Sequence, residues 1–154
     1  MLQTAQEILN TTLQNGLLAS EIGHGAFAIP AAAFLWKKTK SWRSILAFYL
    51  VVYFIDLDHL VEYFQVYGLH FDLIEFFRLD FFRVIGQAKL PFHAWEWVIG
   101  LVYLTRKKKW NYIPKIIMLG IAAHLLWDTI DNGFPPAFYF ILHRISTGFI
   151  LPPH

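Results

Sequence analysis

The sequence predicts an all-α protein, an integral membrane helical bundle of about four transmembrane helices with amphipathic helices at the membrane interface. Its composition is the first observation behind this prediction, with 56% hydrophobic and only 16% charged residues. Soluble domains carry about a quarter of charged residues, so the deviation is typical of a membrane protein. The second observation is that four segments are mostly apolar over roughly the 20 residues that a spanning helix needs. With 154 residues, the chain is expected to form a single membrane domain, 1–154.

The four predicted spans are 17–36, 44–64, 90–105 and 112–130. Pro30 lies inside the first span and is expected to kink it, which membrane helices tolerate. The third span is short unless the residues before Pro91 extend it. The second and fourth spans are by themselves long enough to cross the hydrocarbon core of a bilayer.

Basic residues predict the orientation of the bundle. Nine of the 13 lysines and arginines lie in two connections, 37–43 and 106–115. The positive-inside rule therefore predicts a multi-pass protein of the cell (inner) membrane with both connections in the cytoplasm. A formal net charge of +2 is too small to indicate a nucleic-acid partner, and the absence of cysteine excludes thiolate metal sites. The N-terminus has no basic region before an apolar run, so no cleaved signal peptide is expected.

Three further segments are too polar or too broken to span. Residues 65–88 predict an interfacial amphipathic helix, which either caps the bundle or acts as a lid that touches a lipid substrate. Its charged residues are Asp72, Glu75, Arg78, Asp80 and Arg83, and its apolar residues Leu73, Phe77, Phe81, Val84 and Ile85 lie mostly opposite. Residues 1–16 predict a weaker amphipathic helix, and 134–151 an interfacial or re-entrant segment.

Each predicted span carries an ionisable residue at a similar distance from the basic connections. These residues, each with the basic residue from which it is counted, are His24 (Lys37), Asp56 (Arg43), His93 (Arg106) and His124 (Lys109). The first three intervals are 13 residues and the fourth is 15. At about 1.5 Å per residue, all four lie about 20 Å from the basic ends. They are therefore expected to meet at one level in the outer half of the bilayer.

The spacing of neighbouring polar residues predicts a metal site at this level. Asp56 and His59 are three residues apart, and His124 and Asp128 are four apart, so each pair shares a helix face. The predicted ligands are His24, Asp56, His59, His93, His124 and Asp128, around one or two divalent ions. Mixed histidine and carboxylate ligation favours zinc, with manganese or iron as alternatives. A single such residue can be a hydrogen-bonded packing residue. Inserting an ionisable side chain into the bilayer costs about 2.5–3.5 kcal/mol, so six of them need a compensating interaction, which a bound cation supplies.

Other polar residues are weaker candidates. Asp58 points away from Asp56, so it could hold a ligand histidine in its tautomer or bind a second ion. Glu62 and Glu96 lie near the outer ends of their spans, and Glu21 lies one turn before His24. Arg144 is expected at the surface, with a phosphate clamp as the alternative. His70, His143 and His154 are expected in water or at the interface.

Several short motifs resemble those of the YdjM-like family of inner-membrane proteins, which are described as membrane-bound metal-dependent hydrolases. The matching stretches are Gly23-His24, Asp56-Leu57-Asp58-His59, His124-Leu125-Leu126-Trp127-Asp128 and the exit Asn132-Gly133-Phe134-Pro135-Pro136. The family's His-Arg-Gly-x-Thr-His-Ser stretch is reduced here to residues 88–94, where His93 takes the place of the second histidine and Lys89 that of the arginine. The resemblance implies a short multi-span bundle with a metal-dependent hydrolytic site.

The leading functional hypothesis is a metal-dependent hydrolase that acts on a phosphoester of a lipid or lipid-linked substrate at the outer half of the bilayer. Asp58, Glu62 or Glu96 is the expected general base. The alternative is a non-catalytic membrane protein that binds haem or a metal ion, since four histidines on four helices could ligate haem in opposed pairs. A third possibility is a structural membrane protein. The oligomeric state stays open.

Overall fold

The computed structural model describes residues 17–107 and 112–152, and it confirms the all-α class. Its helices are α2 (Leu17–Phe27), α3 (Ile29–Thr39), α4 (Trp42–Phe54), η1 (Ile55–His59), α5 (Leu60–Tyr67), α6 (Leu73–Arg78), α7 (Asp80–Ile85), α8 (Trp95–Lys107), α9 (Tyr112–Asp131), η2 (Pro136–Tyr139) and α10 (Ile141–Ser146). No strand occurs in these two ranges, apart from one isolated antiparallel bridge between Gln87 and Ile150. The helix predicted over 1–16 lies outside the described residues.

Two helices are long and apolar enough to cross a membrane, judged by length and composition. One is the continuous run Trp42–Tyr67 of 26 residues, and the other is α9 with 20 residues. The predicted first span is divided at Ala28, just before Pro30, into two helices of 11 residues each. The predicted third span begins only at Trp95 and has 13 residues, because a turn occupies 91–93. The four-span bundle is therefore not confirmed.

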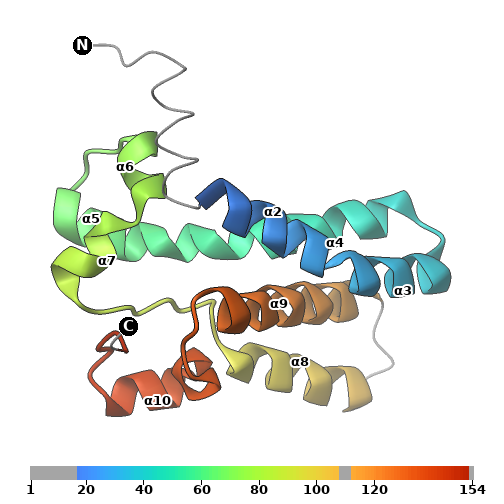
Figure 1. Cartoon of the computed structure of the whole chain (residues 1–154). Helices are drawn as coiled ribbons and strands as arrows, with labels where there is room; N and C mark the ends of the chain where they lie inside the picture. The colour runs from blue at the N-terminus through green and yellow to red at the C-terminus, as the bar shows by residue number, and fades with distance from the viewer. Residues whose placement is uncertain (1–16, 108–111, 153–154) are drawn as a thin grey trace.

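Helix α9 lies at the centre of the fold and packs against α2, α4 and α8. Figure 1 shows α9 between α4 on one side and α8 on the other. The turn between α3 and α4, the C-terminal end of α8 and the N-terminal end of α9 all lie at one end of the molecule, and α5, α6 and α7 lie at the other (Figure 1). Gly120 allows α4 and α9 to approach closely, since a Cβ atom there would lie 2.7 Å from Val51 Cγ1.

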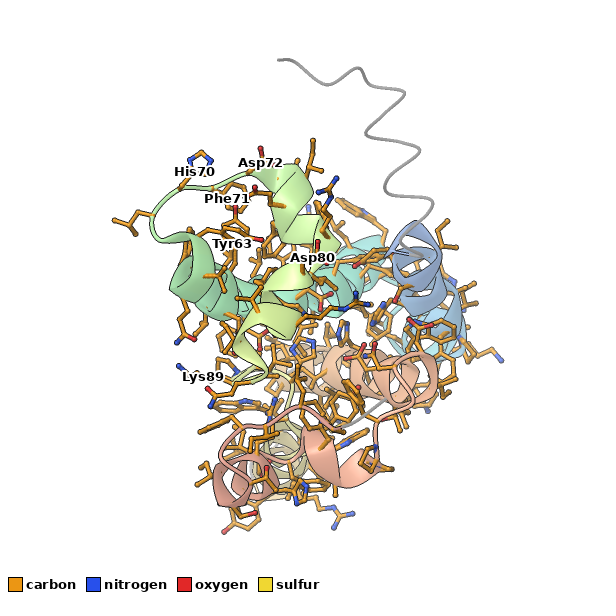
Figure 2. The ribbon with its side chains drawn as sticks, turned by 60° about the vertical axis from the view of Figure 1, so that its left-hand side comes forward. Tyr63, His70, Phe71, Asp72, Asp80 and Lys89 are labelled. Carbon is orange, nitrogen blue, oxygen red and sulfur yellow. The ribbon has the colours of Figure 1, made fainter. Side chains whose placement is uncertain are left out.

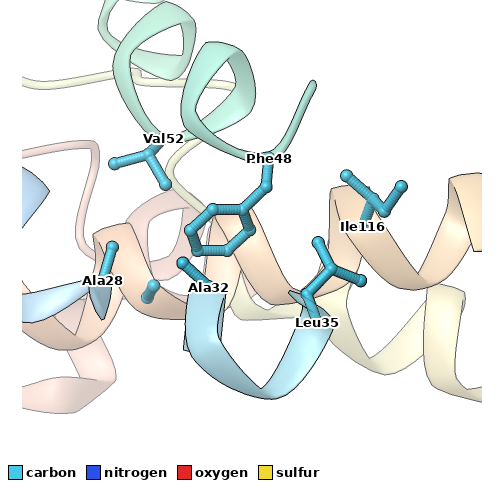
Figure 3. Packing of buried hydrophobic residues seen from close by; sticks show 7 residues of the cluster. Ala28, Ala32, Leu35, Phe48, Val52 and Ile116 are labelled. Atoms are coloured by element: carbon cyan, nitrogen blue, oxygen red, sulfur yellow. The ribbon is translucent and has the colours of Figure 1, made fainter. Parts of the chain in front are cut away.

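An apolar core joins α3 and α4 to α9. Figure 3 shows Phe48 of α4 facing Ala32 and Leu35 of α3, beside Ile116 of α9. The Phe48 side chain is completely buried. The same cluster contains Ala28, Val52 and Ala123. This packing holds α3 and α4 against α9.

The single interfacial helix predicted over 65–88 is wrong, because the chain breaks twice within it. Helix α5 ends at Gly68 with a positive φ of 64°, and Asp72 then caps α6 by accepting hydrogen bonds from the backbone N–H groups of Ile74 and Glu75. Leu79, with a φ of 57°, separates α6 from α7. Of the apolar residues expected on one face, Phe81 is buried but Leu73 and Val84 are exposed. Tyr63 lies beneath this segment, close to Phe71 and Asp72 in Figure 2, and its hydroxyl accepts a hydrogen bond from Asp72 N at 2.8 Å.

The C-terminal segment folds back onto the chain that joins α7 to α8. Ala88 N donates to Phe149 O at 2.9 Å, and Leu151 N donates to Gly86 O at 3.1 Å. Phe138 and Tyr139 of η2 are buried in the same apolar cluster as Leu125 of α9. The residues after α9 therefore cover the turn from which α8 begins.

Candidate metal centre

Residues from four separate parts of the chain meet beside the C-terminal half of α9. They are His24 from α2, Asp56 and His59 from η1, His93 from the turn before α8, and His124 and Asp128 from α9. All six predicted ligands therefore lie in one cluster. The 3₁₀ form of η1 matters here, because side chains three residues apart eclipse one another at three residues per turn. Asp56 and His59 consequently face the same side, with Asp56 Oδ1 3.7 Å from His59 Nε2.

Three of these side chains form the tightest group. Asp56 Oδ1 lies 3.2 Å from His93 Nε2 and 3.4 Å from His124 Nε2, and the two nitrogens are 3.0 Å apart. Asp128 Oδ2 lies 3.2 Å from His124 Nε2 and 3.5 Å from His93 Nε2. Tetrahedral zinc with bonds of about 2.0–2.1 Å separates neighbouring ligand atoms by about 3.3 Å. The donor types and their spacing therefore fit a divalent metal ion.

The outer nitrogen of every histidine in the cluster is held by a hydrogen-bond acceptor. The Nδ1 partners are Ser20 O for His24 (3.0 Å), Asp58 Oδ1 for His59 (3.0 Å), Asp58 Oδ1 for His93 (3.0 Å) and Val52 O for His124 (2.7 Å). Carbonyl and carboxylate oxygens only accept, so each Nδ1 carries the proton. In the neutral imidazole, each Nε2 then keeps its lone pair and turns it toward the carboxylates. This is the pattern by which proteins orient metal-binding histidines.

The inner face of the cluster therefore carries hydrogen-bond acceptors but no hydrogen-bond donors. Neutral Nε2 atoms and the carboxylates of Asp56 and Asp128 would face each other with no hydrogen between them. Additional protons on the histidines, or a cation, must fill this space. Asp56 Oδ2 is also buried without a hydrogen-bond partner in the described part of the chain. One divalent cation satisfies several of these lone pairs at once.

The cluster offers donors for a second ion as well. Asp128 Oδ1 lies 2.9 Å from His24 Nε2, while its other oxygen faces His124. His24, His124 and Asp128 each provide an atom within 4.8 Å of the others. Asp128 could therefore bridge two ions. Zinc, manganese and iron all suit this donor set.

Gly23 explains how His24 reaches the cluster. A Cβ atom at this position would collide with the Trp127 ring, so only glycine lets α2 approach α9 this closely. The Trp127 ring also lies edge-on to His24, with centroids 6.3 Å apart. The close approach brings the His24 ring into a stack on His124, with centroids 4.1 Å apart. The Gly-His pair of the sequence is thus one packing unit.

Asp58 is completely inside the protein and contacts the cluster from behind. Besides the two Nδ1 groups, it accepts from the backbone N–H groups of Phe92 at 2.7 Å and His93 at 3.3 Å. Asp58, His59 and His93 are close enough to form a metal trio of their own. Hydrogen bonds already account for each of these short contacts, so the geometry favours Asp58 as the residue that fixes two histidine tautomers. The sequence left this role open beside that of a ligand.

The other predicted carboxylates lie apart from the six ligands. Buried Glu62 accepts hydrogen bonds from the backbone N–H groups of Lys89 and Leu90, and Glu96 accepts from Leu142 N at 3.1 Å. Their contacts hold the turn before α8 and the start of α10. Neither lines the cavity beside the cluster, whereas Glu21 does. The general-base role given to Glu62 and Glu96 stays a prediction.

Arg144 was expected at the surface, and this expectation is wrong, because its side chain is 0% exposed. Its Nη2 donates to the backbone carbonyl of His93 at 2.9 Å. Burial lowers the pKa of the Arg144 guanidinium, against the opposing effect of Asp58, Glu96 and Glu62. An arginine in an apolar tail gives no signal of this placement in the sequence. His70 and His143 are exposed as expected, and His154 lies outside the described residues.

A cavity of about 630 Å³ adjoins the cluster. Its polar wall includes His24, Asp56, His59, His93 and Asp128. Its aromatic lining is Phe76, Phe77, Phe82, Phe134, Phe138 and Tyr139. Asp56 is accessible there, with 25% of its side chain exposed. Cavities of this size hold small-molecule ligands, so the centre can meet a ligand as well as a metal ion.

No family model, curated protein or solved structure matches the chain. The resemblance carried by residues 23–24, 56–59 and 124–128 therefore stays a prediction. The described structure itself establishes an all-helical chain with two helices that could cross a membrane and a buried histidine–aspartate cluster that could hold a metal ion.

Proposed function

We propose that the protein is an integral membrane, metal-dependent hydrolase that acts on a phosphoester of a lipid or lipid-linked substrate. One observation carries the proposal: of the four histidines and two aspartates in the cluster, three histidines and both aspartates line the wall of an aromatic-lined cavity, and His124 lies buried behind them. A purely structural metal site would be closed, whereas catalytic sites keep a position open to the substrate. The donor set lies where a bound ligand would touch it.

Six residues would hold the metal, namely His24, Asp56, His59, His93, His124 and Asp128. When bound, a divalent cation supplies Lewis acidity, which polarises a phosphoryl oxygen and makes water more acidic. Zinc is the preferred ion, with manganese or iron as alternatives, and Asp128 allows either one or two. The protein contributes the fixed tautomers, because Asp58, Ser20 O and Val52 O hold the outer nitrogens.

The chain also provides a proton acceptor near the centre. Glu21 lies one helical turn before His24 and lines the cavity, but it belongs to none of the possible metal trios. We therefore assign the general-base role to Glu21 in preference to Glu62 or Glu96, which do not line the cavity. Asp58 is assigned the task of positioning His59 and His93. A general base must lie within hydrogen-bond reach of the water that it activates.

The cavity and the apolar helices around it support a lipid substrate. The cavity places phenylalanines beside the polar centre, so one ligand can contact both with a charged head and an apolar chain. The ends of α3, α8 and α9 that adjoin the basic connections of the sequence lie at the end of the molecule away from α5, α6 and α7 (Figure 1). We propose that this basic end faces the cytoplasm, by the positive-inside rule, and that the centre lies in the outer half of the bilayer.

The proposal is tested with the full chain purified in detergent. Metal content is measured by elemental analysis, and turnover is measured with a panel of phospholipids and polyprenyl phosphates. His124→Gln is expected to lose metal and activity, whereas His70→Gln, the same change at an exposed histidine, should retain both. Both variants are checked for unchanged helicity by circular dichroism.

Two results would contradict the proposal. Purified protein without metal after zinc, manganese and iron reconstitution would exclude a metal-dependent reaction, and metal-loaded protein without turnover across the panel would exclude hydrolysis of these lipids. A Soret absorption band would instead indicate the haem alternative. The geometry of one pair does not suit haem, because two axial nitrogens need about 4 Å between them, at about 2 Å from the iron each, and His93 Nε2 and His124 Nε2 are 3.0 Å apart.

A further inference from the structure

Two arginines on α6 and α7 line the same cavity as the candidate metal centre. Arg78 is the last residue of α6 and Arg83 lies in the last turn of α7. On one continuous α-helix, residues five apart point about 140° away from each other. Such a helix would direct the two side chains to different sides. With the break at Leu79, both arginines line one cavity.

The conformation of Leu79 is itself unusual. Its φ of 57° and ψ of 14° lie in the left-handed region, which costs a residue with a Cβ atom roughly 1–2 kcal/mol. Leu79 lines the cavity between Arg78 and Asp80, and it accepts a hydrogen bond from Phe82 N at 3.1 Å. Strained backbone of this kind concentrates at ligand sites, where the fold needs a particular side-chain direction. Here the left-handed conformation of Leu79 sets the direction of the two arginine side chains.

Both arginines are exposed, and neither has a salt bridge or hydrogen bond to another residue within 17–107 and 112–152. Their donors are therefore available to a ligand. Three phenylalanines of the same two helices line the same cavity, namely Phe76, Phe77 and Phe82. A pair of forked cations beside aromatic rings suits a phosphate head with an apolar chain, since guanidinium groups bind phosphate through paired hydrogen bonds.

We propose that Arg78 and Arg83 form a binding site for the phosphate group of an amphiphilic, lipid-like ligand, whose chain lies against the phenylalanines of α6 and α7. The inference rests on the proposed function in one respect, that the ligand so held is the one presented to the metal centre. The arginines bind the charged head and position it. They do not touch the reacting bond.

The test uses alkyl phosphonates, whose carbon–phosphorus bond the proposed hydrolysis does not break. Binding of dodecylphosphonate and methylphosphonate to the full chain in detergent is measured by calorimetry. Wild-type protein is expected to prefer dodecylphosphonate over methylphosphonate. Arg78→Gln/Arg83→Gln should weaken dodecylphosphonate binding at least tenfold, because charge-assisted hydrogen bonds to the anion are lost.

A matched control removes two cations elsewhere. Arg43→Gln/Lys115→Gln changes the charge equally at two exposed residues that do not line the cavity, and it should bind as the wild type does. Arg78→Lys/Arg83→Lys keeps both charges but lacks the paired N–H donors of the guanidinium group. Its affinity for dodecylphosphonate should lie between those of the wild type and Arg78→Gln/Arg83→Gln.

Equal binding by wild type and Arg78→Gln/Arg83→Gln, or no phosphonate binding by the wild type, overturns the inference. If methylphosphonate binds as tightly as dodecylphosphonate, the ligand is not lipid-like, and the arginines instead form a site for free phosphate. Arginine-dependent phosphonate binding by wild-type protein that takes up no metal or shows no turnover supports this inference while the proposed function fails. Metal-dependent turnover by wild-type protein, with phosphonate binding unchanged in Arg78→Gln/Arg83→Gln, supports the proposed function while this inference fails.

Discussion

Replacing Asp58 by asparagine tests how the candidate centre fixes its histidines. The two Asp58 oxygens accept four hydrogen bonds, from His59 Nδ1, His93 Nδ1, Phe92 N and His93 N. Asparagine keeps one accepting oxygen and replaces the other with an NH₂ group, which only donates. Either the two backbone donors or the two imidazole donors would then face another donor. The volume of the side chain hardly changes.

The expected effect is a loss of metal affinity without a loss of any metal ligand. If the amide oxygen stays with the backbone N–H groups, His59 and His93 can avoid the NH₂ group only by moving their protons to Nε2. The lone pairs that face Asp56 would then be lost. Removing such a supporting carboxylate weakens metal binding about 10–100-fold, which corresponds to roughly 1.4–2.7 kcal/mol.

The assay is a zinc titration of the full chain in detergent against a chromophoric chelator. Asp80→Asn serves as the matched control, because Asp80 is exposed and lines the same cavity but makes no hydrogen bond with its side chain in the described part of the chain. The control should bind zinc as tightly as the wild type. Wild-type zinc affinity in a folded Asp58→Asn variant would refute the idea that Asp58 orients these histidines.

Three further predictions concern stability and are checked by thermal unfolding in detergent. Gly23→Ala should destabilise the protein by about 1–3 kcal/mol and weaken zinc binding, because the new methyl group meets the Trp127 ring. The control Gly100→Ala, in open space on α8, should be neutral or slightly stabilising. Equal melting temperatures for the two variants would contradict the close packing of Gly23 against Trp127. Phe48→Ala empties the core shared by α3, α4 and α9 and should cost about 3–5 kcal/mol, and a loss below 1 kcal/mol would show that this core is not closely packed. Zinc at a thousand times its dissociation constant should stabilise the folded chain by about 4 kcal/mol over chelator-treated protein, and no shift in melting temperature would mean that zinc does not bind the folded state.

The sequence by itself determined the helical class and the residues that gather in the cluster. Apolar runs between basic connections predict helices, and two of them, 44–64 and 112–130, agree closely with Trp42–Tyr67 and α9. Counting residues from the basic ends placed His24, Asp56, His93 and His124 at one level, and the structure brings these side chains together. Such counting works because a helix advances by a constant rise per residue.

The length of the other helices could not be predicted in this way. Ala28 divides the first predicted span, and the third begins four residues after Pro91. Hydropathy reports how apolar a segment is, but where a helix starts and ends depends on local hydrogen bonds and on what packs against it. Only the tertiary structure therefore shows that two helices are long enough to cross a membrane.

The direction of individual side chains was likewise decided by tertiary contacts. Asp58 supports His59 and His93 because the turn before α8 packs against η1, and Arg144 is buried because α10 folds back onto His93. The left-handed residue Leu79 turns Arg78 and Arg83 to one cavity, which a regular helical periodicity would have placed apart. Sequence periodicity carries the geometry of one helix at a time, whereas the atoms of this site come from segments more than a hundred residues apart, such as His24 and Asp128.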